Sequence, residues 1–451
     1  MLMKSLVFVA WGWLIIVAPV RAEEPLVNVR DSGAEPDGKT LCTPAIQKAI
    51  DQCSESGGGT VYLPPGVWLS GTLFLKNNVT LYLEAGSTLL GSADPKDYPD
   101  NIAKIHSYTD TYVKQSLIAG ENLHNVAIRG RGTIDGQGTK FRFRGNAYKR
   151  RPYTIRLVGC RDVLVEDVHL RNSAMWMQHY LACDRVRIHG VQVSNHVNGN
   201  NDGLDIDGCH DFVVSDCIID SDDDAIVLKA TSPRSNENVT ITNCVLSSLS
   251  NALKMGTEST GGCTNLTVTN CAIHKPRRSE RGIAGIALEI VDGGALDRVT
   301  ISNITIDGYL SPIFLRLGNR ARPYTDGAPK PPVGTLRNVI LSNIVATDAS
   351  KIGCPIAGIP GHRIENVTLS NIRCEFEGGG TSEDARRKIE EKEDAYPECV
   401  IFGTLPAYGL YCRHVKGLRL LNVQFAANKP DARPAMVFDD AEDALVDGKK
   451  P

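Results

Sequence analysis

The sequence predicts an all-β protein: a single-stranded right-handed parallel β-helix with a short helix that caps its amino-terminal end. Short strands rich in β-branched residues recur through most of the chain, and each is followed by Asn, Asp or Gly at a turn. Most successive strands are separated by roughly 22–28 residues, about the length of one coil of a β-helix. The segments between them lack apolar residues at helical spacing. This combination is typical of a β-helix.

The repeated unit has the pattern V-x-[VI]-x-[ND]-[CVI], and its last positions are separated by 23, 26, 27, 27, 33, 40, 28 and 51 residues. One unit cannot bury its apolar face alone, so successive units must stack. A propeller would need periods of about 40–50 residues, and a leucine-rich horseshoe would need regular Leu and Asn spacing. We expect the longer steps to be loops inserted into single coils. The units are residues 163–168, 186–191, 213–217, 239–244, 266–271, 299–304, 339–344, 367–372 and 418–423.

The first residues predict a secretory signal peptide over 1–22. Lys4 gives the positive start, residues 6–17 the apolar run and residues 20–22 the cleavage site. A membrane anchor is the alternative, but the run is shorter than the roughly 20 residues of a span. We therefore expect residues 23–451 to form a single secreted or periplasmic β-helix domain with inserted loops and no membrane association.

The net charge bears on which partners the protein binds, and the cysteine spacing bears on whether it contains disulfides. Removal of the signal changes the formal charge from −3 to −5, which gives no reason to expect nucleic acid or an anionic membrane. The chain has 13 cysteines, and Cys217, Cys244 and Cys271 follow one another at steps of 27 residues. This spacing favours a stack of buried thiols, while disulfides, for which Cys42 and Cys53 are suitably spaced, are the alternative. We find no metal-ligand spacing among the cysteines.

Two segments outside the repeats predict helices. Residues 43–53 carry apolar residues at helical spacing, and Gly57, Gly58 and Gly59 end that helix. It would cover the open end of the solenoid and prevent edge-to-edge pairing. Residues 382–392 form a charged insertion that we expect to be a solvated surface helix, with a lid over the binding groove as the alternative.

Asparagines at the coil corners are expected to form side-chain ladders. Five of them also satisfy N-x-T, so glycosylation is the alternative. These residues are Asn78, Asn238, Asn265, Asn303 and Asn366.

The most informative feature is a pair of acidic clusters, residues 201–207 and 221–226, which stand 22 residues apart. This interval is close to one repeat, so corresponding residues should lie on strands about 4.8 Å apart. Carboxylates held that close raise one another's pKa, which suits acid–base chemistry or a bound cation. Strict alternation would direct Asp202 and Asp224 inward with Leu204 and Ile226, so we expect a turn before each strand.

The chain resembles the pectin-degrading β-helix enzymes. Residues 33–38, 45–50, 57–61, 64–66 and 85–87 are similar to the start of those proteins, a likeness that several β-helix families share. Asn201-Asp202-Gly203-Leu204-Asp205 followed by Asp223-Asp224-Ala225-Ile226 resembles the specific paired signatures of glycoside hydrolase family 28, the polygalacturonases and rhamnogalacturonases. The resemblance covers residues 28–425 and implies a pectin-lyase-like catalytic solenoid that hydrolyses pectic polysaccharides or oligosaccharides.

The resemblance also implies roles for three residues. That family inverts the anomeric centre, so Asp223 would be the general acid, while Asp202 and Asp224 would hold and deprotonate water. An inverting pair is usually separated by about 6.5–9.5 Å. The resemblance implies no cofactor and no metal, and we expect a monomer.

Two family motifs are altered. The histidine of the family's Gly-His-Gly motif corresponds to Asn251, and the arginine and lysine of its Arg-x-Lys motif correspond to Ala287 and Glu289. A glutamate there would repel a galacturonate, which favours a rhamnogalacturonan-type or otherwise unusual linkage, unless Lys254 or Arg281 restores a positive charge.

Other candidate substrate contacts lie on neighbouring coils. His179 resembles a histidine that lines the family's groove, and simple exposure is the alternative. Lys229, Lys254 and Glu258 follow the acidic strand or lie on the next coil, where solvated polar residues are also common. The loops at 320–334 and 378–396 would favour exo action if they closed one end of the groove.

Two other functions stay open. A polysaccharide lyase would use Asp222, Asp223 and Asp224 to ligate Ca²⁺. A non-catalytic glycan-binding solenoid would bind without turnover.

Overall fold

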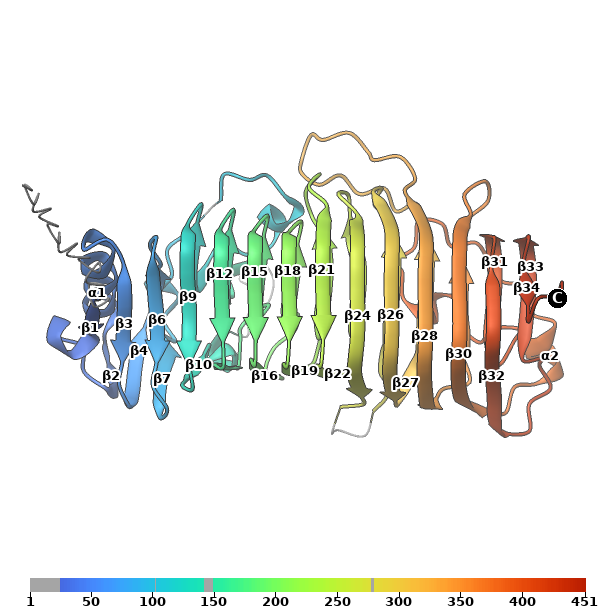
Figure 1. The fold of residues 1–451 in the computed structure, drawn as a ribbon, viewed down its shortest axis with the longest axis horizontal. Coiled ribbons are helices and arrows are strands. Elements are labelled where there is room, and N and C mark those ends of the chain that lie inside the picture. Colours follow the sequence, from blue (N-terminus) through green and yellow to red (C-terminus); the bar gives the residue numbers. More distant parts are fainter. Residues whose placement is uncertain (1–24, 102, 142–148, 277–279) are drawn as a thin grey trace, which may run out of the picture.

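The computed structural model describes residues 25–101, 103–141, 149–276 and 280–451, and the predicted signal peptide lies outside these ranges. Parallel strands stacked side by side along one axis dominate the described residues (Figure 1). The predicted parallel β-helix is therefore confirmed. Each coil contributes strands to three parallel sheets.

The first sheet runs the whole length of the molecule, from β1 to β34. Its strands are β1 Leu26–Asn28, β3 Gly59–Leu63, β6 Val79–Leu83, β9 His124–Gly130, β12 Arg161–Glu166, β15 Asp184–His189, β18 His210–Ser215, β21 Asn236–Thr242, β24 Cys263–His274, β26 Ala295–Asp307, β28 Thr335–Ala349, β30 Ile364–Gly378, β32 Arg419–Lys429 and β34 Leu445–Val446.

The second sheet joins the carboxyl-terminal half of β24, so that the later long strands serve both sheets. Its separate strands are β2 Asp37–Leu41, β4 Gly66–Ser70, β7 Ser87–Gly91, β10 Thr133–Asp135, β13 His169–Arg171, β16 Gln192–Asn195, β19 Ile218–Ser221 and β22 Val245–Ser248.

The third sheet carries both acidic clusters. Its strands are β5 Leu73–Phe74, β8 Ser116–Glu121, β11 Tyr153–Val158, β14 Gln178–Leu181, β17 Leu204–Asp207, β20 Ile226–Ala230, β23 Asn251–Ser259, β25 Gly282–Ile290, β27 Tyr309–Leu317, β29 Cys354–Ala357, β31 Leu410–Lys416 and β33 Met436–Glu442.

Stacking of like residues builds the core. In the first sheet Val163, Val186, Phe212, Val239 and Leu266 are successive register partners, and all are buried. Each such side chain contributes roughly 1.5–3 kcal/mol by leaving water. The period-2 pattern of the repeats thus sets which face of every strand points inward.

Exposed asparagines form the predicted ladders along the coil corners. Asn265 donates to Asn238 at 3.0 Å, and Asn303 donates to Asn270 at 3.2 Å. These residues have φ near +57°, a left-handed conformation that Asn tolerates better than most residues. The amide side chains therefore hold the turns in register.

The cysteines are buried free thiols, which confirms the predicted thiol stack. Cys217, Cys244 and Cys271 lie on neighbouring coils, since Val245 donates its backbone N–H to Cys217 and Ala272 to Cys244.

Helix α1, Thr43–Glu55, covers the amino-terminal end as predicted and buries Ile46, Ala49, Ile50 and Cys53 (Figure 1). The predicted helix over 382–392 is wrong, because only α2, Ser382–Ala385, is helical there. Short 3₁₀ turns complete the structure, namely η1 Val29–Ser32, η2 Pro95–Asp97, η3 Tyr108–Thr111, η4 Gly138–Phe141 and η6 Cys399–Phe402. Among the helices of the described ranges, none is long and apolar enough to cross a membrane.

Candidate active site

The acidic clusters lie at the start of two neighbouring strands of the third sheet. Asp202 comes two residues before β17, and Asp224 comes two residues before β20. Both residues precede the alternation of their strand, so the predicted turns are confirmed. Beyond the turns, Leu204 and Ile226 point inward as register partners.

Close packing at Gly203 fixes the first turn. A Cβ on this residue would lie 2.4 Å from Cγ2 of Ile219 and 2.6 Å from the carbonyl oxygen of Ala225. These distances leave no room for a side chain, so only glycine brings Asp202 this close to the next coil.

Polar side chains hold both turns from behind. The amide of Asn195 donates to the carbonyl oxygen of Asp202 at 3.1 Å. At the second turn, the hydroxyls of Ser221 and Ser248 both donate to the carbonyl oxygen of Asp223 at 2.7 Å. The carboxylates therefore rise from a stiff backbone, which suits a preorganised site.

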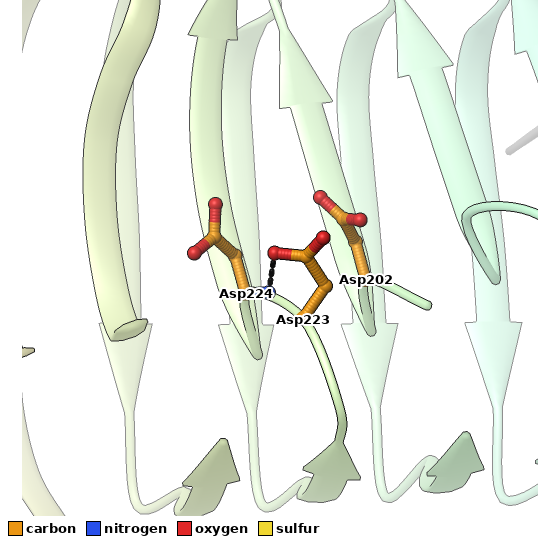
Figure 2. Close-up of side chains that lie close together, drawn as sticks. All are labelled: Asp202, Asp223 and Asp224. Carbon is orange, nitrogen blue, oxygen red and sulfur yellow. Dashed lines mark hydrogen bonds between the residues drawn. The ribbon is translucent and has the colours of Figure 1, made fainter. Parts of the chain in front are cut away.

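Three carboxylates come together above these turns. One oxygen each from Asp202, Asp223 and Asp224 lies within 4.8 Å of the others (Figure 2). The separation of roughly 6.5–9.5 Å expected of an inverting pair refers to whole carboxyl groups and not to their nearest oxygens. The cluster confirms that the 22-residue interval places the two motifs side by side.

Asp224 is held as an anion. Burial raises its pKa, but the ammonium groups of Lys254 and Lys229 and a hydrogen bond from Asn251 outweigh burial and leave the pKa below the ordinary value. Nζ of Lys254 lies 3.2 Å from one oxygen, and Nδ2 of Asn251 donates to the other at 2.8 Å.

The pKa of Asp223 is shifted in the opposite direction. Burial and the neighbouring charge of Asp224 raise its pKa, although Lys254 and Lys229 lower it in part. One oxygen accepts the N–H of Asp224 at 3.0 Å. Adjacent residues thus have pKa values moved in opposite directions, the pattern expected of an acid and a base.

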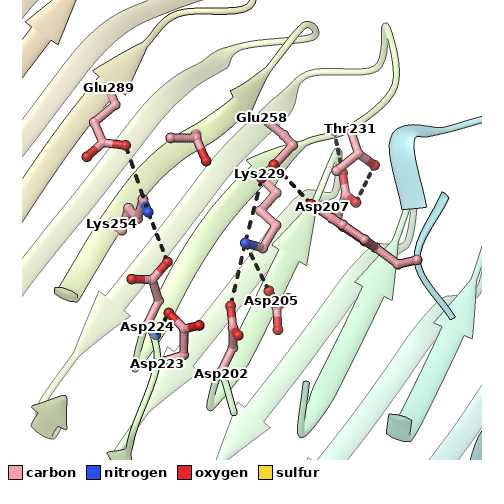
Figure 3. Close-up of polar contacts among 12 residues, drawn as sticks. Asp202, Asp205, Asp207, Asp223, Asp224, Lys229, Thr231, Lys254, Glu258 and Glu289 are labelled. Carbon is pink, nitrogen blue, oxygen red and sulfur yellow. Dashed lines mark hydrogen bonds and ion pairs between the residues drawn. The ribbon is translucent and has the colours of Figure 1, made fainter. Parts of the chain in front are cut away.

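Asp202 forms a buried pair with Asp205, a residue for which the sequence suggested no role. Burial, Asp205 and Asp223 raise the pKa of Asp202, and burial also raises the pKa of Asp205. Nζ of Lys229 lies 3.5 Å from an oxygen of each (Figure 3). Lys229 therefore faces both carboxylates and lowers the pKa of each in part.

Lys229 and Glu258 lie where the sequence suggested, in the site. Nζ of Lys229 is 3.7 Å from Glu258 and 4.6 Å from the ring centroid of Trp176. Lys229 and Arg322 hold the pKa of Glu258 well below its usual range despite burial.

Glu289 does not face a substrate, which corrects the expected repulsion of galacturonate. Its side chain is fully buried, and Nζ of Lys254 lies between it and Asp224, 3.9 Å from Glu289 (Figure 3). Burial raises the pKa of Glu289 to about 8. Lys254 is also buried, so it supports Asp224 instead of meeting the sugar.

Three other predicted contacts need correction. Asn251 is buried and donates a hydrogen bond to Asp224. His179 is fully buried beneath Trp176 and bonds Asp207 through Nε2 at 3.1 Å, so it does not line the groove. Arg281 forms ion pairs with Asp348 and Glu377 at 2.7 and 2.9 Å, which turn it away from the cluster.

The carboxylates open into a pocket of about 200 Å³. Larger cavities exist elsewhere on the described surface, but their linings lack these acids. The walls come from strands β20 and β23 and from segments between strands of several coils. They are Tyr112, Met175, Trp176, Asn200, Asp202, Asp223, Asp224, Lys229, Thr257, Glu258, Arg322 and Tyr396.

Sequence reasoning missed the aromatic and arginine walls. Tyr112 lies between β7 and β8, Arg322 between β27 and β28, and Tyr396 between β30 and β31. Tyr396 belongs to the insertion whose helix was wrongly predicted, and its position over Lys254, at 5.7 Å, favours the lid alternative. The only signal in the sequence was the length of these loops.

Known proteins show similarity over most of the chain. A family model described as "Glycosyl hydrolases family 28" matches residues 53–393. A probable polygalacturonase of Vitis vinifera is 37% identical over 213 residues, and an exo-poly-alpha-D-galacturonosidase of Dickeya chrysanthemi is 30% identical over 261 residues. These matches cover 44% and 47% of this chain and 43% of each relative, so the chain matches less than half of their length.

Solved structures support the fold. A family 28 exopolygalacturonase of Yersinia enterocolitica superposes with a TM-score of 0.70 at 21% identity, over 95% of this chain and 80% of that one. An exopolygalacturonase of Thermotoga maritima gives a TM-score of 0.66 at 23% identity, over 78% and 88%.

Proposed function

Because the chain belongs to glycoside hydrolase family 28, we propose that it is a polygalacturonase-type glycosidase that hydrolyses pectic polysaccharides or oligosaccharides. The observation that carries this proposal is the opposed environment of two adjacent carboxylates at the bottom of one pocket. The pKa of Asp223 is raised and that of Asp224 is lowered. Hydrolysis of a glycosidic bond needs this acid and this base.

In the proposed reaction, Asp223 donates its proton to the leaving glycosidic oxygen. Asp224 takes a proton from the attacking water, whose oxygen bonds to the anomeric carbon as the glycosidic bond breaks. Asp202 orients that water, because its raised pKa makes it the weaker candidate for the base. The family resemblance supports inversion of the anomeric centre.

The shape of the pocket supports action at a chain end. Its volume of about 200 Å³ is small, and Tyr112, Arg322 and Tyr396 reach it from three different loops. An endo-acting enzyme needs a groove open at both ends to admit a polymer. The name of the Dickeya relative, an exo-enzyme, agrees with this part of the proposal.

Two alternatives have weaker support. A calcium-dependent lyase would need Asp222 beside Asp223 and Asp224, but Asp222 accepts a bond from His196 at 2.7 Å and is not among the pocket walls. Lys229 and Lys254 already form ion pairs with Asp202 and Asp224. A non-catalytic binding solenoid gives no reason for adjacent residues with opposed pKa shifts.

We also propose that the enzyme is monomeric and acts on plant cell-wall pectin outside the cytoplasm. The predicted signal peptide supports export.

Digestion of defined pectic oligosaccharides tests the function. We expect release of monosaccharide from the start of the time course, with the new anomeric centre inverted when followed by NMR. Early oligomers would refute exo action, and a retained anomer would refute inversion. An unsaturated product that absorbs ultraviolet light would indicate a lyase, and no product from any pectic substrate would refute the hydrolase.

A further inference from the structure

The strand that should recognise a uronic acid carries no cation toward the pocket. At the positions of the family's arginine and lysine, Ala287 packs in an apolar cluster with Phe314, and Glu289 is fully buried. A carboxylate on the substrate must therefore find its partner elsewhere. Among the described side chains that line the pocket, Lys229 and Arg322 are the cations.

Lys229 is already committed to the protein. Its Nζ lies within 3.7 Å of Asp202, Asp205 and Glu258, and its side chain is only 7% exposed. An ammonium group has three donors, and here three carboxylates face it. It has no capacity left for a carboxylate on the substrate.

Arg322 has donors to spare. Its Nη2 pairs with Glu258 and lies 3.6 Å from Asp292, while Nε and Nη1 have no protein partner within the described ranges. The side chain is 23% exposed, and Cζ lies 3.4 Å from the ring centroid of Tyr108. The ring fixes the plane of the guanidinium group, in which the second N–H of Nη2 and the adjacent N–H of Nε or Nη1 form a flat fork.

The loop that carries Arg322 is anchored to the solenoid. Oδ1 of the buried Asp292 accepts Nε of Arg320 at 2.9 Å and the backbone N–H of Arg322 at 3.0 Å. Nη2 of Arg320 also donates to the carbonyl oxygen of Thr257 at 3.1 Å. The arginine is thus held over the pocket by a fixed framework, as selective binding requires.

We propose that Arg322, on the loop between β27 and β28, binds the carboxylate of the uronic acid in the pocket and so replaces the cations that β25 lacks. This inference rests on the proposed function. A planar fork binds a carboxylate through two parallel hydrogen bonds, which an ester or a neutral sugar cannot reproduce. The loop therefore determines specificity for an acidic terminal residue.

The test compares digalacturonic acid with the same disaccharide methyl-esterified at C6 of its non-reducing residue. Wild-type enzyme should prefer the free acid. Arg322→Gln should lower kcat/KM for the acid by roughly 10- to 100-fold, mainly through KM, and leave the ester little changed. The kcat/KM of Arg322→Lys for the acid should lie between the values of wild type and Arg322→Gln, because lysine keeps the charge but loses the fork.

The control is Arg337→Gln on β28, which removes an exposed arginine paired with Asp297 at 3.5 Å in the first sheet. This variant should keep the wild-type ratio of kcat/KM for the acid to kcat/KM for the ester. An Arg322→Gln enzyme that keeps that ratio, or loses both substrates equally while folded by circular dichroism, would refute the inference alone. A wild-type enzyme that cleaves neither disaccharide nor any longer pectic oligosaccharide would refute the proposed function as well.

Discussion

Asp222, Asp223 and Asp224 are consecutive residues that face three different surroundings. Asp222 pairs with His196 outside the pocket, Asp223 meets the pocket with a raised pKa, and Asp224 is held as an anion by Lys254 and Asn251. A strand that begins directly after a turn sends adjacent side chains in different directions. The sequence shows three identical aspartates, and the turn gives each carboxyl group a different environment.

Asp223→Asn tests the role of the acid against a matched neighbour. The amide is isosteric but has no proton to donate, so kcat should fall by roughly 10²- to 10⁴-fold. Asp222→Asn, one residue away, should keep activity close to wild type. Initial rates on oligogalacturonides, with a melting curve for each variant, measure both. Equal losses in the two variants would contradict the assignment.

Glu289 gives the protein a pH-dependent stability. Burial raises its pKa to about 8, above its ordinary value of 4.5. Between these values the folded state keeps a proton that the unfolded state has lost, so this residue lowers stability as pH rises. Glu289→Gln removes the titration and should raise the free energy of unfolding at pH 8.5 by up to a few kcal/mol, with little gain at pH 4.5.

Urea denaturation at both pH values measures this difference. Glu365→Gln, an exposed change on β30, is the control and should have no effect at either pH. An equal effect of Glu289→Gln at the two pH values would show that the benefit has nothing to do with a proton.

At the scale of elements, strands and loops differ in how far the sequence predicts them. The alternation of Val186 and Ile188, repeated in every coil, predicts both the strand and its inward face. The loop residues Tyr112, Arg322 and Tyr396 belong to no repeat, so periodicity cannot say where they return to the solenoid. His179 is predicted to line the groove from the family resemblance alone, and a resemblance does not show that Trp176 covers it.

The turn before β17 predicts a cost for any side chain at Gly203. Gly203→Ala places a Cβ against Ile219 and Ala225, so it should lower the free energy of unfolding by about 1–3 kcal/mol. It should also reduce activity, because Asp202 moves with the turn. Gly199→Ala is the matched control, since its Cβ would meet nothing closer than 4.0 Å. Denaturation curves that coincide for the two variants would contradict this account.

At the scale of the whole molecule, stability comes from contacts between neighbouring coils and not from covalent cross-links. Hydrogen bonds join the coils from β1 to β34, and the thiols that stack within them are free. Repetition made this level the most predictable from sequence. The pocket, by contrast, is formed by segments from distant parts of the chain, and no local sequence pattern predicts such contacts.

The free thiols predict indifference to reductant. Alkylation of the denatured, unreduced protein should label all 13 cysteines, and dithiothreitol should not change the melting temperature. Because the thiols are buried, the native protein should label slowly under the same conditions. Mass spectrometry measures each case. Labelling that requires prior reduction would show that disulfides form.

The asparagine ladders bear on the choice of an expression host. Asn238, Asn265, Asn303 and Asn366 are N-x-T sites whose Nδ2, the atom to which an N-linked glycan attaches, already donates to the side chain on the preceding coil. A eukaryotic secretory pathway would glycosylate such sites while the chain is still unfolded, before the ladder can form. Glycan at these atoms would then obstruct the closing of successive coils, so bacterial production is the safer route to native enzyme.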